Sequence, residues 1–195
     1  IRGSIYHSHS FDAMMTHIPG FKIVMPSNAL DAFGLMLACL KDQNPTMYLM
    51  PKALLRVEGE EQIPGEPALT PEGRKQLKDM IDAPLGDRSK WKAKWPDLKD
   101  PNIELSQGKI VHEGDQVTVV TYGRHVLIAK EVAQTLAKEG ISVEVIDLRT
   151  LWPYDWKMIS NSIKKTKRVL FVNEDTEVTN FGEHLLRRTI EEHFY

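Results

Sequence analysis

Two histidines stand one residue apart near the start of the chain, in the run Tyr6-His7-Ser8-His9-Ser10. On an extended segment both imidazoles point to the same face, and an imidazole near neutral pH can donate or accept a proton in a reaction. With Asp12 or His17 the pair can also be drawn as a zinc site, but the spacing matches no standard zinc pattern. A lone histidine is usually a surface or satisfied core residue, so the residues alone assign no reaction to His7.

Polar runs follow three predicted strands in the second half of the chain, and parallel sheets bind ligands at such strand ends. The runs are Gly123-Arg124-His125, Asp147-Leu148-Arg149-Thr150 and Asn173-Glu174-Asp175. None is a phosphate-binding signature, because the chain has neither a GxGxxG motif nor a Walker A loop. We interpret Glu174 and Asp175 as solvated loop acids and Arg149 as an ion-pair partner.

The composition is that of an ordinary globular protein. The 195 residues, 42% hydrophobic and 27% charged, suffice for one large or two small domains. The net charge of -2 gives no reason to expect a nucleic acid or a membrane as partner. No apolar run approaches the roughly 20 residues that span a bilayer. The single cysteine, Cys39, cannot form an intrachain disulfide, which favours a reducing compartment.

The first part of the chain reads as strand, helix, strand. Phe21 to Met25 is a predicted strand, Ser27 or Asn28 is placed to cap a helix that runs to about Lys41, and Thr46 to Met50 is a second strand. This order favours a parallel pair with a right-handed crossover. The helix is expected to bury a stripe at helical spacing, made of Leu30, Phe33, Leu37 and Leu40.

Residues 58–107 interrupt this regularity and hold six of the eleven prolines. That composition is typical of a linker, but Trp91, Trp95 and Leu98 and a predicted short helix from Pro71 to Ile81 argue against full disorder. We expect an ordered, irregular excursion wrapped over a domain surface.

After residue 108 the pattern predicts alternating strands and helices. The expected strands are Val117 to Tyr122, Ile141 to Leu148 and Arg168 to Val172. The expected helices are His125 to Glu139, Pro153 to about Lys165, and Phe181 to His193. The first of these helices should end at Gly140 and face inward with Ile128, Ala129, Val132, Ala133 and Leu136. The fold class is therefore α/β, with a mainly parallel sheet covered on both faces.

Residues Tyr6 to Pro26 resemble a segment of the thiamine-diphosphate-dependent 2-oxo acid dehydrogenases. In their beta subunits the segment around the active-site histidine is written loosely as L-Y-H-S-Q-S…A-H-x-P-G-x-K-V-V-x-P. Further matches cover about three quarters of the chain and include residues 34–45, 51–56, 108–123, 145–153 and 173–175. Tyr6 and Cys39 favour the branched-chain enzyme over the pyruvate enzyme.

The resemblance implies a partial subunit in three parts. Residues 1–57 would be the C-terminal part of the pyrimidine-binding domain, 58–107 a linker longer than the family's, and 108–195 a truncated transketolase C-terminal-like domain. The family's activating glutamate would lie upstream of residue 1, and its last strand and helices beyond Tyr195. We expect the chain alone to be inactive and its last sheet to leave an exposed edge that self-associates.

The resemblance also implies a reaction and its participants. Two alpha and two beta subunits would share thiamine diphosphate, with Mg²⁺ held by alpha. A small, branched-chain 2-oxo acid would be decarboxylated oxidatively, and its acyl group would pass to the lipoyl arm of an acyltransferase core. His7 matches the histidine that faces the reacting substrate. The compartment would be the bacterial cytoplasm or the mitochondrial matrix.

A monovalent cation site is implied at the turn after the first predicted helix. There the backbone carbonyl of Cys39 and the side chains of Asp42 and Asn44 would supply oxygen ligands to K⁺. In this chain we expect weak binding or none, because the family's remaining ligands come from a loop preceding residue 1.

Two other functions stay open. A transketolase-like or deoxyxylulose-phosphate-synthase-like enzyme shares the domain pair but should carry basic residues for a sugar phosphate. A non-catalytic assembly module would use the doubly wound domain only for subunit contacts.

Overall fold

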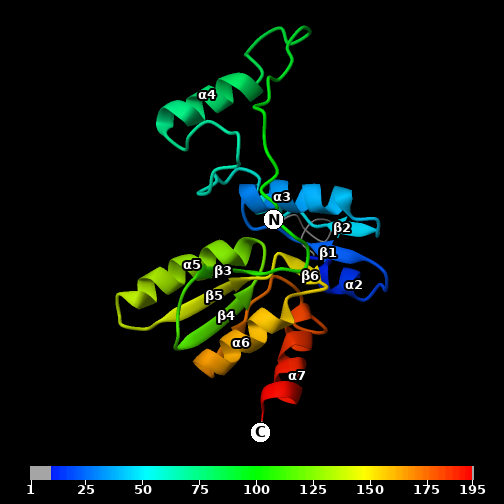
Figure 1. Cartoon of the computed structure of the whole chain (residues 1–195), viewed down its shortest axis with the longest axis vertical. Coiled ribbons are helices and arrows are strands. Elements are labelled where there is room, and N and C mark those ends of the chain that lie inside the picture. The colour runs from blue at the N-terminus through cyan, green and yellow to red at the C-terminus, as the bar shows by residue number, and fades with distance from the viewer. Residues whose placement is uncertain (1–9, 195) are drawn as a thin grey trace.

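The computed structural model describes residues 10–194 of the chain. A body of two sheets with their helices carries one long arm, which projects from the body near α3 (Figure 1). The described helices are too short or too polar to cross a bilayer.

The first sheet is built from the elements that the sequence predicts, and one more. α2 (Asp12–Thr16) precedes β1 (Lys22–Val24), α3 (Ala29–Lys41), β2 (Thr46–Tyr48) and the short 3₁₀ helix η1 (Lys52–Leu54). β1 and β2 pair in parallel, as expected. Asn28 caps α3, since its side chain accepts a hydrogen bond from the Asp31 N–H at 2.8 Å.

The predicted buried stripe of α3 is wrong. Asp31, Gly34 and Leu35 are the buried residues of the helix, whereas Leu40 is 75% exposed. The returning end of the arm packs on this helix so closely that a Cβ at Gly34 would lie 2.7 Å from Ile103. The buried face is therefore set by a segment almost 70 residues away, which helical spacing alone does not reveal.

The second sheet has four strands in the order β3-β5-β4-β7. They are β3 (Lys109–His112), β4 (Val117–Thr121), β5 (Val143–Asp147) and β7 (Val169–Phe171). β4 pairs in parallel with both β5 and β7, and β3 is antiparallel to β5. The mainly parallel α/β fold is confirmed, with an antiparallel edge strand that the sequence reading did not predict. β7 forms the opposite edge, where Leu170 is 55% exposed.

Helices cover both faces of this sheet: α5 (Arg124–Ala137) one face, α6 (Trp156–Thr166) and α7 (Phe181–His193) the other. The alternation of side chains along β4 divides the core, because Val119 packs with Ala133 of α5 while Val120 packs with Ile159 of α6. In α5 the expected inward face is partly wrong. Ile128 and Val132 are 42% and 50% exposed, and the helix buries Val126 and Ala133.

One strand of the second half joins the first sheet. β6 (Thr150–Trp152) pairs antiparallel with β1, with Ile23 opposite Trp152. Because this strand occupies the residues before Pro153, the next helix does not begin there as predicted. It begins at Trp156, where the Asp155 side chain accepts a hydrogen bond from the Met158 N–H at 3.0 Å.

The arm contains the predicted helix α4 (Pro71–Ile81), capped by Thr70. Its outgoing and returning chains are tied together, because the Lys99 N–H donates to the Pro64 carbonyl at 2.7 Å and the Lys94 N–H to that of Met80 at 2.8 Å. The expectation of order is confirmed. The expectation that the excursion wraps over a domain surface is wrong, since the arm extends away from the body (Figure 1).

Candidate functional site

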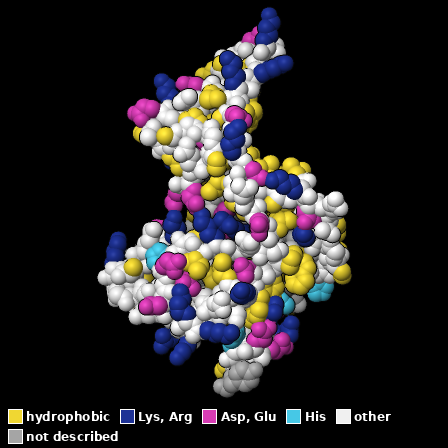
Figure 2. Space-filling view, in the orientation of Figure 1, with side chains coloured by type: hydrophobic (Ala, Val, Ile, Leu, Met, Phe, Trp, Pro, Cys, Tyr) yellow, Lys and Arg dark blue, Asp and Glu magenta, His cyan; other side chains and the backbone are white. Residues whose placement is uncertain are grey.

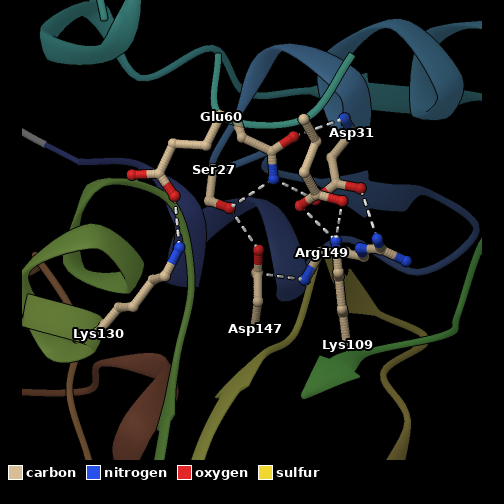
Figure 3. Close-up of polar contacts among 9 residues, drawn as sticks. Ser27, Asp31, Glu60, Lys109, Lys130, Asp147 and Arg149 are labelled. Carbon is tan, nitrogen blue, oxygen red and sulfur yellow. Dashed lines mark hydrogen bonds and ion pairs between the residues drawn. The ribbon is translucent and has the colours of Figure 1, made fainter. Parts of the chain in front are cut away.

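The carboxyl ends of β1 and β5 meet at the junction of the two sheets. Ser27, just after β1, donates a hydrogen bond from Oγ to Asp147 Oδ2 at 2.5 Å, and Asp147 is the last residue of β5. The Arg149 N–H donates to the other oxygen of Asp147 at 3.0 Å. Figure 3 shows Ser27 and Asp147 pointing at one another from the two domains. A polar contact therefore fills the strand ends where an open ligand site would be expected.

A second polar contact crosses the same junction. Arg149 lies at φ +58 and its Nη2 is 2.5 Å from Asp31 Oδ1, forming an ion pair between the first turn of α3 and the β5–β6 connection. The Asp31 side chain is fully buried and that of Arg149 is 12% exposed. Asn28 Nδ2 donates to the second oxygen of Asp31 at 2.6 Å. The interpretation of Arg149 as an ion-pair partner is confirmed.

Asp147 is buried without a charged partner in direct contact. Burial, together with the negative charge of nearby Asp31, raises its pKa to about 7, and the hydrogen bond from Ser27 only partly opposes this. The Asp147 carboxyl therefore gains or loses its proton near neutral pH.

A cavity of about 870 Å³ opens beside this junction. Its apolar wall comes from η1 and the start of α5, including Leu54, Leu55 and Val126, and its polar wall includes Ser27 and Asn28. The volume is in the range of small-molecule sites.

The start of the arm closes one side of this cavity through ion pairs. Lys109 of β3 contacts both carboxylate oxygens of Glu61, at 2.5 and 2.6 Å, and Lys130 of α5 contacts Glu60. Figure 3 shows Lys130 reaching Glu60 across the space between α5 and the arm. The two lysines are thus already neutralised by the protein and do not present free positive charge to a ligand.

A buried carboxyl connects α2 to the second domain. Asp12 is fully buried and accepts a hydrogen bond from the Tyr122 hydroxyl, which lies just after β4. Burial and the neighbouring Asp175 raise the pKa of Asp12, while the hydrogen bond from Tyr122 opposes the shift. Burial and the Asp12 charge also raise the pKa of Tyr122. Asp12 is the member of this group that closely follows the histidine-containing segment in sequence.

The histidine-containing segment that the sequence singled out lies only partly within the described residues. His7 and His9 lie outside the described residues, and His17 is exposed. The Asp12 carboxyl accepts a hydrogen bond from the Tyr122 hydroxyl, so its position does not support the alternative zinc site. Within residues 10–194 no group of three or more His, Cys, Asp or Glu side chains is arranged to hold a metal ion.

The predicted K⁺ ligands Cys39, Asp42 and Asn44 lie at the end of α3 and in the turn that follows it. Cys39 is in the last turn of α3, and Asp42 is the C-cap residue. One Asp42 oxygen accepts from both the N–H and the side-chain amide of Asn44 at 2.8 Å, and the other pairs with Lys22. Lys22 and these hydrogen bonds lower the pKa of Asp42 to about 2. Burial raises the pKa of the Cys39 thiol, which fits an unreactive cysteine.

Sequence reasoning missed Ser27, Asp31 and the lysines beside the cavity. A usable signal existed for Asp31, since it is the one carboxylate in the otherwise mainly apolar helix α3. Such a residue is seldom fully buried unless it is paired. No comparable signal marks Lys109 or Lys130, because surface lysines are common.

Comparison with known protein families identifies the two domains to which these sheets belong. Residues 1–58 match the family described as transketolase, pyrimidine binding domain. Residues 106–195 match transketolase, C-terminal domain. Residues 1–58 and 106–195 therefore belong to these two transketolase domain families. The resemblance of Tyr6 to Pro26 and of the later motifs to beta subunits of 2-oxo acid dehydrogenases is confirmed by the sequence relatives of the chain.

Its sequence relatives include beta subunits of 2-oxoisovalerate dehydrogenase. It is 34% identical to that subunit from Bacillus subtilis (strain 168), over 91% of this chain and 44% of the relative. For Pseudomonas aeruginosa the identity is 33%, over 100% of this chain and 49% of the relative. The chain thus spans about half the length of the curated relatives it matches.

A solved structure supports the fold. "Split gene transketolase, inactive beta4 tetramer" superposes with a TM-score of 0.62 at 21% identity, over 93% of this chain and 48% of that one.

The buried aspartates in the described part of the chain are occupied by protein contacts and do not form a metal site for a diphosphate. Proteins hold a diphosphate with a glycine-rich loop, a helix N-terminus or a metal bound by carboxylates. The buried carboxyls Asp12, Asp31 and Asp147 are all engaged with protein groups.

The raised pKa of Asp147 predicts a pH-dependent stability. Its folded pKa of about 7 exceeds the ordinary value of 3.8, so between these values the folded state holds a proton that the unfolded state has lost. This group therefore lowers the free energy of unfolding as the pH rises from about 4 to about 7, by up to about 4 kcal/mol. In Asp147→Asn, urea unfolding should show a smaller loss over that window.

The exposed Asp115→Asn variant is the control and should leave the wild-type pH profile unchanged. An Asp147→Asn profile that coincides with the wild type would show that Asp147 does not titrate in this window.

Proposed function

We propose that this chain is part of the beta subunit of a thiamine-diphosphate-dependent 2-oxo acid dehydrogenase. The observation that carries the proposal is the combination of both transketolase domains, in order, with relatives at about one-third identity that are 2-oxoisovalerate dehydrogenase beta subunits. The subunit would take part in oxidative decarboxylation of a branched-chain 2-oxo acid. An alpha subunit and a lipoyl acyltransferase core would be its partners.

The family implies thiamine diphosphate as the cofactor, which would be bound at the interface with the alpha subunit and supply the carbon nucleophile. Mg²⁺ would be held by the alpha subunit. In this chain the contribution that we assign is that of His7, which would donate or accept a proton at the bound substrate. Asp12 and Tyr122 support this role, because their hydrogen bond fixes the helix that follows the His7 segment to the second domain.

We also propose that the turn from Cys39 to Asn44 binds K⁺ weakly. Asp42 is the only charged oxygen donor of the three, and it already has Lys22 as its cationic partner. A potassium ion would have to compete with that ammonium group.

The proposal is tested with the gene product that contains these residues, purified with and without its alpha subunit. Thiamine diphosphate should bind, and 2-oxoisovalerate should release CO₂, only when both subunits are present; the 195-residue chain alone should show neither activity nor tight binding. Pyruvate should be the poorer substrate. Replacing K⁺ by Na⁺ in the assay tests the cation site. Turnover by the 195-residue chain alone, or no turnover by the assembled subunits, would overturn the proposal.

A further inference from the structure

The tip of the arm belongs to neither matched domain, since residues 59–105 lie between the two matched ranges. Its sequence, residues 85–95, is LGDRSKWKAKW. Four cations stand there against the single carboxylate of Asp87, a net charge of +3, whereas the whole chain carries -2. The remaining residues therefore carry -5, and the positive charge is concentrated at the end of the arm.

The cations of the tip are unpaired in the described structure. Arg88, Lys90, Lys92 and Lys94 are exposed and form no ion pair with any residue between 10 and 194. At the base of the arm the situation is the opposite, since Lys41, Lys109 and Lys130 each contact a carboxylate. Figure 2 shows the Lys and Arg side chains standing out from the far end of the arm.

Large apolar side chains are exposed among these cations. Leu85 is 97% exposed and Trp95 is 67% exposed. An exposed apolar group within a polar rim marks interaction surfaces, and tryptophan is among the residues that contribute most to binding energy there.

The tip has a defined conformation rather than an open one. Gly86 adopts φ +105, Asp87 Oδ1 accepts from the Ser89 N–H at 2.9 Å, and Arg88 Nε donates to the Pro84 carbonyl at 3.1 Å. The Lys94 backbone is hydrogen-bonded to Met80 at the end of α4. A surface that is already ordered loses less entropy when a partner binds.

We propose that the arm tip, residues 85–95, is a docking surface for a partner protein that presents clustered carboxylates around an apolar pocket. Trp95 and Leu85 enter the pocket, while Arg88, Lys90, Lys92 and Lys94 form the rim that steers the acidic surface into place. Charge complementarity selects the partner, because the tip carries a net charge of +3 and a surface of clustered carboxylates attracts it.

Other occupants fit less well. A single-stranded nucleic acid uses several stacking aromatic rings along a groove, and of the two tryptophans of the tip only Trp95 is exposed, Trp91 being half-buried. The glutamates beside the cavity of a second copy, Glu58, Glu60 and Glu61, are each already paired with a cation, so that acidic cluster is a poor partner for the tip.

The test uses the full 195-residue chain and a fluorescein-labelled, glutamate-rich peptide with interspersed leucines, followed by fluorescence anisotropy. The triple variant Lys90→Glu, Lys92→Glu, Lys94→Glu should bind the peptide about tenfold more weakly than the wild type. The variant Lys138→Glu, Lys157→Glu, Lys164→Glu changes the net charge equally at exposed positions on the body and should bind as the wild type does. Trp95→Ala should weaken binding at least about fivefold while leaving its salt dependence unchanged.

Equal loss in the arm and body variants would overturn the proposal, because binding would then follow net charge alone. A Trp95→Ala variant that binds the peptide as tightly as the wild type would also overturn the proposal. An oligothymidylate or vesicles of phosphatidylserine and phosphatidylcholine, titrated in parallel, should bind more weakly than the peptide. Tighter binding of either through the same lysines would replace the acidic protein by that partner and overturn the assignment.

Discussion

Replacing Arg149 by alanine should destabilise the chain by about 3 to 5 kcal/mol. Arg149 is the cationic partner of Asp31, whose carboxylate is fully buried. The deletion leaves that negative charge in the interior with only the Asn28 amide as a hydrogen-bond donor. It also removes the contact between α3 and the segment that joins β5 to β6. Urea unfolding measured at constant pH gives the change in the free energy of unfolding.

Two variants show whether the loss comes from the buried pair. Arg187→Ala removes an exposed pair with Glu191 one helical turn away and should cost no more than about 0.5 kcal/mol. Adding Asp31→Asn to Arg149→Ala removes the uncompensated charge and should restore much of the stability. If the double variant is as unstable as the sum of the single ones, the ion pair is not the cause.

Local sequence signals predicted most helices and the parallel pairs. α4 and α7 have the predicted bounds because each combines a polar capping residue with an amphipathic pattern. β4 and β5 are runs rich in β-branched residues, which pack well inside a parallel sheet. In these elements the information lies within the segment itself.

The misses share one physical origin, which is dependence on distant partners. β6 is three residues long and is a strand only because β1, more than 120 residues earlier, offers its edge. β3 likewise depends on β5. The buried face of α3 depends on the returning arm, which lies against Gly34, and the buried face of α5 depends on its packing against β4 and β5.

The same reason limits prediction of the site. Asp147 and Arg149 were recognised as polar residues at a strand end, but their partners Ser27 and Asp31 come from the other domain. Spacing along the chain does not show that a cavity forms there, or that Glu60 and Glu61 of the arm cover it. A short motif can carry a prediction of chemistry without such partners, and the role of His7, which lies outside the described residues, stays a prediction of that kind.

In the subunit that contains these residues, assembled with its alpha subunit, His7→Ala should lower turnover of 2-oxoisovalerate by about 10²- to 10⁴-fold. An imidazole that transfers a proton to or from the bound substrate contributes to the barrier of the chemical step. Its removal should therefore lower kcat and leave the thermal stability of the assembled enzyme nearly unchanged. Steady-state kinetics together with thermal unfolding separate the two effects.

His17→Ala is the matched control, because His17 is an exposed histidine within the same matched segment. It should keep near-wild-type turnover. A His7→Ala enzyme with wild-type kcat would make His7 a structural residue. A parallel fall in kcat and in thermal stability would point to the same conclusion, since a proton-transfer group that faces the substrate contributes little to folding. The proton-transfer role requires that kcat falls while stability is retained.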